Sequence, residues 1–329
     1  MNRFSFARNQ ILSLEALIGW VGNDVLPLPS FNLMNASSYQ LAMIGCSLLL
    51  MIGSALGSEN SKSDIDFIRF VEAASGAKLQ TAVTRFEGRS GEVVDLIGAV
   101  HIADAKYYQD LNQRFRGYEG VLYELVGGAF KPGRDRKRAG DPSKMQWIGV
   151  LQESMKNTLQ LTGQLEGIDY TVPQMIHADM GISEFFGTQA SKGESFLGLW
   201  AKAWRAQMNV LEEGGRSEQP GLAKILEILC RKDSAVELKR IVAREFDQVE
   251  RLMEGIETEG GTVIIGERNR VALEVLDAEL KKGKKKIGIF YGAAHMPDMS
   301  IKLQALQFTK KTTEWLTAWD LPAPPKPSR

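Results

Sequence analysis

Short apolar runs and amphipathic stretches alternate along most of the chain. Residues 79–86 alternate apolar and polar positions, which is typical of a half-buried strand, and residues 92–98 form a second, largely apolar run. The polar, glycine-containing segment 87–91 between them predicts a hairpin. A helix is expected over residues 104–115 and a further strand over 120–126. Strand, helix, strand in this order implies a parallel pair of neighbouring strands joined by a right-handed crossover.

In the middle of the chain the apolar positions repeat with a different period. Residues 145–257 are mostly helical in pattern and predict an all-helical insertion. The α/β pattern then resumes, with a helix expected over 267–282, a strand over 286–291 and a final strand over 312–319. The chain is therefore predicted to have an α/β fold that is interrupted by helices.

Composition excludes some classes of partner. The chain has 329 residues, 44% of them hydrophobic and 24% charged, which is ordinary for a soluble globular protein. Its 40 Lys and Arg residues balance 40 Asp and Glu residues. Because no net field favours a polyanion, neither nucleic acid nor an anionic membrane surface is an expected partner.

An uncharged apolar stretch over 41–57 precedes the α/β region and is followed at once by polar residues. Its length fits a secretory signal or a short membrane anchor, with Ala55 and Gly57 as small residues at a cleavage point. Alternatives are a true start at Met34 or an apolar helix docked on the domain. The expected organisation is an N-terminal segment (1–63), an α/β domain (64–321) and a proline-rich tail (322–329), in an exported or membrane-anchored protein.

Two of the three histidines occupy equivalent places. His101 and His295 each stand three positions after a glycine, Gly98 or Gly292, that ends an apolar run. Such a glycine lets the backbone bend or approach a ligand closely. Residues that follow buried parallel strands lie at the carboxyl edge of the sheet, where ligands bind. The two imidazoles are therefore expected at one site.

Two charged residues call for partners. Glu124 is the one carboxylate in the apolar run 120–126, and a buried carboxylate is costly unless it is paired, protonated or bound to metal. The alternative is that Glu124 faces solvent on an edge strand. Arg268 lies at the start of a helix, where the helix dipole disfavours a cation. This placement predicts a carboxylate partner for Arg268, such as Glu124, or a substrate oxygen.

Together these motifs resemble the TraB/PrgY/GumN/Tiki family over residues 79–319. The pattern is Gly98-Ala99-Val100-His101, a strand that ends in Glu124, Gly266-Glu267-Arg268-Asn269 before a helix, and Gly292-Ala293-Ala294-His295. The resemblance implies an α/β fold with a mixed central sheet made of two related halves. From the Tiki members it implies a metal-dependent protease activity that rests on the two histidines and the glutamate, with Arg268 at the position of the family's arginine. Other members regulate peptide pheromone signalling or have no established activity.

The implied ligands are His101, Glu124 and His295. Two imidazoles and a carboxylate suit a divalent zinc, manganese or cobalt ion, which lowers the pKa of a bound water and polarises a carbonyl group. Arg268 is then expected to stabilise an oxyanion or to orient Glu124. No HExxH helix is present, so a thermolysin-like site is excluded.

Glu124 has a second interpretation, as the general base. A further metal ligand would then come from His177 or Asp179, in a segment, 168–180, that also resembles bacterial members of the family. A single histidine near a predicted helix start is typically a structural hydrogen-bonding group, which is the alternative for His177.

Two hypotheses of function follow. The first is a metal-dependent hydrolase that acts on a peptide or protein substrate outside the cytoplasmic membrane. The second is a non-catalytic module that sequesters a peptide or small ligand in the same cleft. Substrate identity and oligomeric state have no signal in the sequence.

Overall fold

The computed structural model describes residues 67–131, 156, 159–192, 236–244 and 263–323. The apolar stretch 41–57, the end of the proline-rich tail and most of the segment 145–257 lie outside these residues, so the expectations for them stay predictions. In the described part of the chain, no helix combines the length and apolar character needed to cross a membrane.

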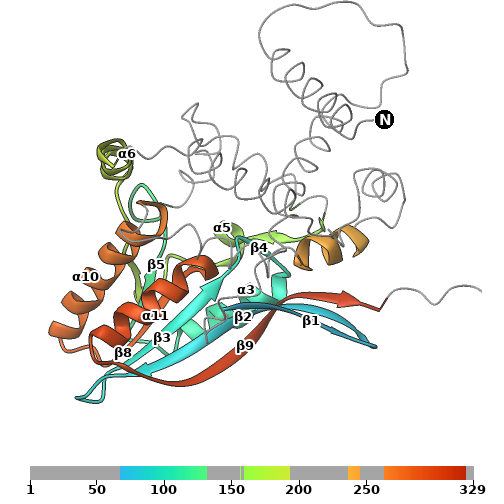
Figure 1. Ribbon diagram of the computed structural model, residues 1–329, viewed down its shortest axis with the longest axis horizontal. Coiled ribbons are helices and arrows are strands. Elements are labelled where there is room, and N and C mark those ends of the chain that lie inside the picture. The colour runs from blue at the N-terminus through green and yellow to red at the C-terminus, as the bar shows by residue number, and fades with distance from the viewer. Residues whose placement is uncertain (1–66, 132–155, 157–158, 193–235, 245–262, 324–329) are drawn as a thin grey trace, which may run out of the picture. The chain divides into compact units, whose positions relative to one another are not determined.

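A mixed seven-stranded sheet organises the described residues, with parallel strands on one side and antiparallel strands on the other (Figure 1). The parallel strands, in spatial order, are β3 (Val93–Ala99), β8 (Lys286–Gly292), β5 (Gly120–Tyr123) and β7 (Met175–His177). The antiparallel strands are β2 (Gly76–Glu87), which pairs with β3, and β1 (Ile68–Ala73) and β9 (Thr309–Pro322), which both pair with β2. The α/β fold with a mixed sheet is thereby confirmed.

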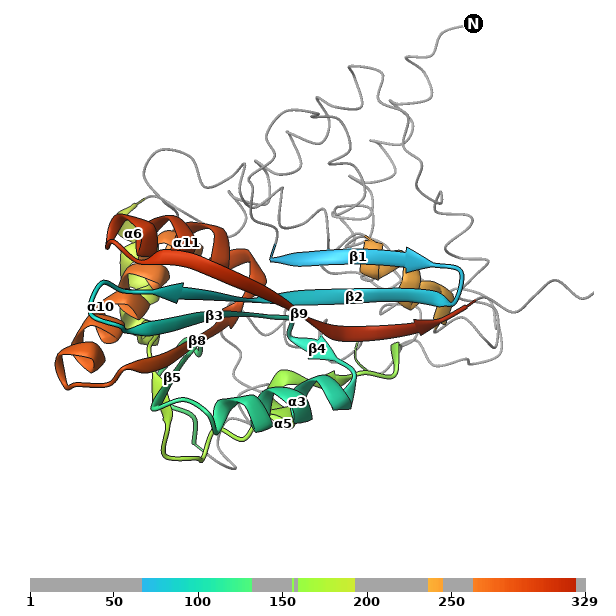
Figure 2. The ribbon, with the colours of Figure 1, turned by 90° about the horizontal axis from the view of Figure 1, so that it is seen from below.

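Helices cover both faces of this sheet. In Figure 2, α3 (Ala105–Phe115) and α11 (Met296–Ala305) lie on opposite sides of the strands. The buried side chains of α3 are the ones that its spacing predicts, namely Tyr107, Tyr108, Leu111 and Phe115.

The other elements include the two-residue strands β4 (Ile102–Ala103) and β6 (Thr162–Gly163), which pair with each other, and the helices α5 (Gln164–Gly167), α6 (Ile182–Ser191) and α10 (Arg268–Lys281). A π-helix, η2 (Val263–Glu267), precedes α10, and a 3-10 helix, η3 (Ala293–His295), follows β8. Residues 236–244 are also helical.

Two predictions of arrangement are wrong. β3 and β5 are parallel but are not neighbours, because β8 lies between them. The centre of the sheet is buried on both faces, and β8 has the apolar side chains for it, since Ile287, Ile289, Phe290 and Tyr291 are fully buried. The segment 145–257 is also not all-helical, since it contributes β6 and β7. The hairpin of β2 and β3 is confirmed.

Helix α3 holds the chain that leads to His101. The Tyr107 hydroxyl donates to the Gly98 carbonyl at 3.1 Å, and the Tyr108 hydroxyl donates to the Val100 carbonyl at 2.9 Å. Each such bond contributes a net ~1 kcal/mol, and both rings are fully buried. The exit of β3 is therefore fixed by the helix that follows it.

Candidate functional site

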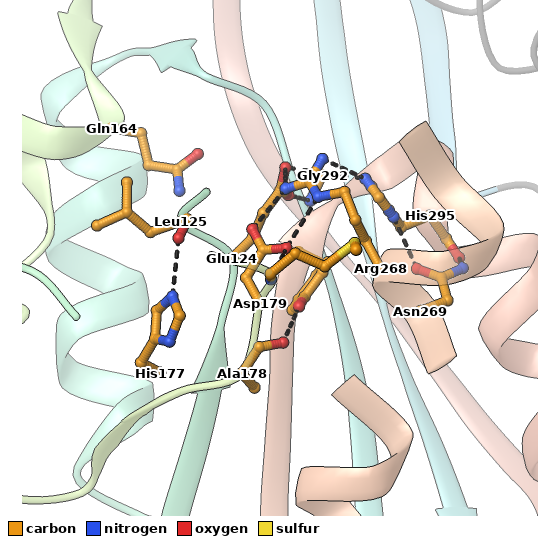
Figure 3. Close-up of polar contacts among 12 residues, drawn as sticks. Glu124, Leu125, Gln164, His177, Ala178, Asp179, Arg268, Asn269, Gly292 and His295 are labelled. Atoms are coloured by element: carbon orange, nitrogen blue, oxygen red, sulfur yellow. Dashed lines mark hydrogen bonds and ion pairs between the residues drawn. The ribbon is translucent and has the colours of Figure 1, made fainter. Parts of the chain in front are cut away.

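The carboxyl ends of the parallel strands gather charged side chains from distant parts of the sequence. Glu124 directly follows β5, Asp179 stands two residues after β7, and His295 stands three residues after β8. Arg268, the first residue of α10, enters the same group of side chains (Figure 3). Parallel pairing of β8, β5 and β7 brings these residues together, as expected for this edge of an α/β sheet.

Arg268 lies at the centre of the cluster. Its Nε donates to Asp179 Oδ1 at 2.9 Å, and its Nη2 donates both to Asp179 Oδ2 at 2.7 Å and to Glu124 Oε1 at 2.6 Å. The side chain of Arg268 is 8% exposed and that of Asp179 is 0% exposed. The predicted partnership of Arg268 with Glu124 is confirmed, and Asp179 is a second partner.

Glu124 faces this buried cluster, so the solvent-facing interpretation is wrong. Burial raises the pKa of its carboxyl, but the charge of Arg268, aided by His295 and His101, outweighs burial and holds the pKa below its ordinary range. Its Oε2 also accepts a hydrogen bond from the Gly292 amide at 2.7 Å. Burial also disfavours the charged form of Arg268 and so lowers its pKa. The charges of Glu124 and Asp179 outweigh burial and hold the pKa of Arg268 above its ordinary value. Both groups are therefore charged at neutral pH.

His295 is a buried, neutral imidazole beside this ion pair. Its Nδ1 lies 2.7 Å from Asn269 Oδ1, and its Nε2 lies 3.4 Å from Arg268 Nη1 and 3.8 Å from Glu124 Oε1. Burial is the main reason that its pKa falls to about 4, against the attraction of Glu124. At neutral pH the ring therefore carries a lone pair that is available to act as a base.

His101 reaches the same edge but is not part of the buried cluster. Its side chain is exposed, and its backbone carbonyl accepts a hydrogen bond from the Gln164 amide at 2.8 Å. The imidazole still acts electrostatically on Glu124, since its charge contributes to the lowered pKa of that carboxyl. It therefore lies on the side of the cluster that is open to solvent.

His177 occupies the end of β7 and not a helix start, so that detail of the prediction is wrong. Its Nε2 lies 2.8 Å from the Leu125 carbonyl oxygen, and its ring packs against the edge of Tyr123. In Figure 3, His177 is separated from Arg268 and His295. His177 therefore binds the backbone, as expected if it is a structural hydrogen-bonding group.

The two glycines of the repeated motif are not explained by backbone freedom. Positive φ angles among the described glycines occur elsewhere, and neither Gly98 nor Gly292 has one. A Cβ at Gly292 would lie 3.4 Å from Glu124 Oε2, which is ordinary contact. Gly292 donates its amide hydrogen to Glu124, and the expected bend or close approach to a ligand stays a prediction.

The side chains of this cluster meet some of the requirements of a site for a divalent metal ion. His295 presents Nε2 towards Glu124 Oε1, and the hydrogen bond of Nδ1 to Asn269 resembles the support that metal-bound histidines receive. Within the described ranges, however, no three His, Cys, Asp or Glu side chains are gathered so that they could hold a metal ion. Arg268 is bonded to the Glu124 oxygen that would coordinate the ion.

Several members of the cluster had no separate signal in the sequence. Asn269 binds His295, the Gly292 amide binds Glu124, and the Tyr291 hydroxyl donates to the Ala178 carbonyl. Asn269 and Gly292 had a sequence signal only as members of the Gly266-Glu267-Arg268-Asn269 and Gly292-Ala293-Ala294-His295 motifs.

Comparisons of the chain with protein-family models, with curated proteins and with solved structures find no match. The geometry of the cluster is therefore the basis for an assignment of function.

Proposed function

We propose that the chain is a hydrolase, acting on a peptide substrate, whose reaction centre is formed by Glu124, Arg268 and His295. The observation that carries this proposal is the position of His295 Nε2, 3.8 Å from Glu124 Oε1 and 3.4 Å from Arg268 Nη1. A neutral base, an ionised carboxylate and a buried cation then face one place at the sheet edge where ligands bind.

In this proposal His295 is the general base. Its Nε2 takes a proton from a water as that water attacks the scissile carbonyl carbon, and the imidazolium later gives the proton to the leaving amine. Glu124 stabilises the imidazolium, because its negative charge lies close to the ring. Arg268 is a fixed positive charge that stabilises the oxyanion as it develops.

Arg268 suits that role because it is held in advance. Its two bonds to Asp179 and its bond to Glu124 fix the guanidinium plane. The cation does not have to reorganise when charge appears on the substrate oxygen, and little water surrounds it. Donors arranged in this manner supply roughly 10²–10³ in rate in well-studied acyl-transfer sites.

A divalent zinc, manganese or cobalt ion is an alternative form of the proposed centre. His101, Glu124 and His295 would hold it, with His295 Nε2 then a ligand in place of the base, and the ion would lower the pKa of a coordinated water. It would have to compete with Arg268 for Glu124 Oε1. Metal analysis of the purified full chain tests this: about one ion per chain, lost in His295→Gln, is expected, and metal-free, fully active protein would contradict it.

Hydrolysis is tested by incubating the full chain with a mixture of defined peptides and detecting new termini by mass spectrometry. The Glu124→Gln and His295→Gln variants are each expected to lose about 100-fold or more of the rate, as general acid–base groups do. The matched control is His177→Gln, which removes an imidazole from the same sheet edge but outside the cluster. Equal loss in all three variants, or in none, would overturn the proposal.

A second candidate is a module that sequesters a peptide or small ligand without cleaving it. One observation favours it, namely that Arg268 already satisfies both neighbouring carboxylates. This candidate predicts that peptides are retained intact and without stoichiometric metal, and that Arg268→Lys weakens their retention. New peptide termini would exclude it.

We also propose that the protein acts outside the cytoplasmic membrane, by export or by an N-terminal anchor. The support is the uncharged apolar stretch 41–57. N-terminal sequencing of the protein from its native cells is expected to show cleavage after this stretch, or membrane association if it is retained. An intact Met1 on a protein found in the cytoplasmic fraction would contradict this.

A further inference from the structure

We infer that Asn269 and Asp298 are positioning residues that fix His295 in the tautomer with its hydrogen on Nδ1. Nε2 then carries a lone pair that faces Glu124 and Arg268. The catalytic meaning of the inference rests on the proposed function, whereas the tautomer itself does not.

The first step is the orientation of the Asn269 side-chain amide. Its Nδ2 lies 3.0 Å from the His295 backbone carbonyl oxygen and 2.7 Å from Asp298 Oδ2. Both of these are acceptors only, one of them a carboxylate. Turning the amide by 180° would place Oδ1 against two other oxygens. The nitrogen must therefore face them, and Oδ1 must face the imidazole.

The second step concerns the imidazole. Asn269 Oδ1 lies 2.7 Å from His295 Nδ1, and an amide oxygen can only accept. Nδ1 must therefore carry the hydrogen of the neutral ring. Asn269 is fully buried, so no water competes for this contact.

The opposite side of the ring gives an independent check. His295 Nε2 lies 3.4 Å from Arg268 Nη1, and a guanidinium nitrogen can only donate. Nε2 must therefore be an acceptor. Asn269 and Arg268 contact different nitrogens of His295 and select the same tautomer.

Asp298 extends this arrangement towards the surface. It lies in the first turn of α11, and its Oδ2 accepts hydrogen bonds from both Asn269 and Lys302. Its side chain is 29% exposed, whereas Asn269 is 0% exposed. A partly solvated carboxylate thus orients a fully buried amide, which in turn orients the base. Because Asn269 is neutral, it fixes the tautomer without adding charge to the ring.

The tautomer decides whether His295 can be a base at Nε2. With the hydrogen on Nε2, the lone pair would face Asn269 and no proton could be taken from the substrate side. A catalytic histidine held in the wrong tautomer loses roughly 10⁴-fold in rate in a serine protease triad. Asn269 is therefore expected to affect kcat more than KM, since it contacts His295 and not the substrate.

Nitrogen-15 NMR of histidine-labelled full chain tests the inference directly. Only three imidazoles contribute, and the spectra of His101→Gln and His177→Gln assign the signals. At neutral pH, Nδ1 of His295 is expected at the position of a protonated ring nitrogen and Nε2 at that of an unprotonated one. The reverse pattern, or rapid averaging of the two signals, would overturn the inference. The spectrum of the wild-type protein is enough to show either outcome.

Variants separate positioning from simple loss of structure. Asn269→Leu is expected to let the two tautomers mix. Asn112→Leu is the matched control, because Asn112 also bridges two backbone groups, Gly167 and Asp169, but on α3. An unchanged tautomer in Asn269→Leu would overturn the role of Asn269.

The same variants distinguish this inference from the proposed function. If peptides are not cleaved but the Nδ1–H pattern is present, the tautomer assignment stands and the hydrolase fails. If peptides are cleaved and the pattern is absent, the assignment fails. In active protein, Asn269→Leu is expected to lower kcat about 100-fold or more with KM within a few-fold.

Discussion

Asp179→Asn is the sharpest perturbation of the cluster, because it removes one charge and keeps the shape of the side chain. Asp179 is fully shielded from solvent and accepts two bonds from Arg268, which is itself 8% exposed. Loss of one partner of a buried ion pair typically costs about 3–5 kcal/mol, since the remaining charge is left buried. Arg268 keeps Glu124 as a partner, so the lower end, about 3 kcal/mol, is expected.

The free energy of unfolding is measured by urea denaturation of the wild type and the variant at neutral pH. The matched control is Glu274→Gln, which breaks the exposed pair with Arg270 on α10 and should cost less than about 1 kcal/mol. High salt is expected to reduce the small effect at Glu274 and to leave the large one at Asp179 nearly unchanged. If Asp179→Asn costs no more than the control, the cluster does not hold Arg268 as described.

Two further predictions concern pH and packing. The folded pKa of His295, about 4, lies below the ordinary 6.5, so the unfolded chain binds more protons between these values. The contribution of neutral His295 to the free energy of unfolding is fully present above about pH 6.5. As the pH falls towards 4, up to about 3 kcal/mol of this contribution is lost. Urea midpoints at neutral pH and near pH 4 should show a smaller fall in His295→Gln than in His177→Gln, and equal falls would refute this. At Gly167, an added Cβ would lie 2.7 Å from the Tyr108 Cβ, so Gly167→Ala should cost about 1–3 kcal/mol in thermal or urea unfolding. Gly181→Ala, with nothing within 4 Å, should be near neutral, and similar costs at both positions would contradict the packing described.

The pattern of apolar side chains within short stretches of the sequence predicted several helices and strands correctly. Alternation of apolar and polar side chains identified β2, and apolar runs identified β3 and β8. The i, i+3, i+4 spacing identified α3. The order of strands could not be read in the same manner. β8 enters between β3 and β5 because the sheet centre must be buried on both faces, which is a property of the whole sheet.

The site was predictable to a similar degree. An isolated carboxylate in an apolar strand and an arginine at a helix start each lacked a partner, so the pair Glu124–Arg268 followed from their separate costs. Asp179 was expected as a possible metal ligand, and its contact with Arg268 could not be foreseen because β7 is only three residues long. The contact of Asn269 with His295 depends on the crossing of α10 and η3, for which the sequence has no pattern.

In the proposed reaction, His295 takes a proton from one water at this sheet edge and Glu124 stabilises the charge that His295 gains. The most direct measurement is the rate of peptide cleavage, by mass spectrometry, for the wild type, Glu124→Gln, His295→Gln and the double variant. Large losses are expected in each single variant and little further loss in the double variant, because the two residues act as a unit. Single-variant rates equal to that of the wild type, or losses that simply multiply in the double variant, would contradict it.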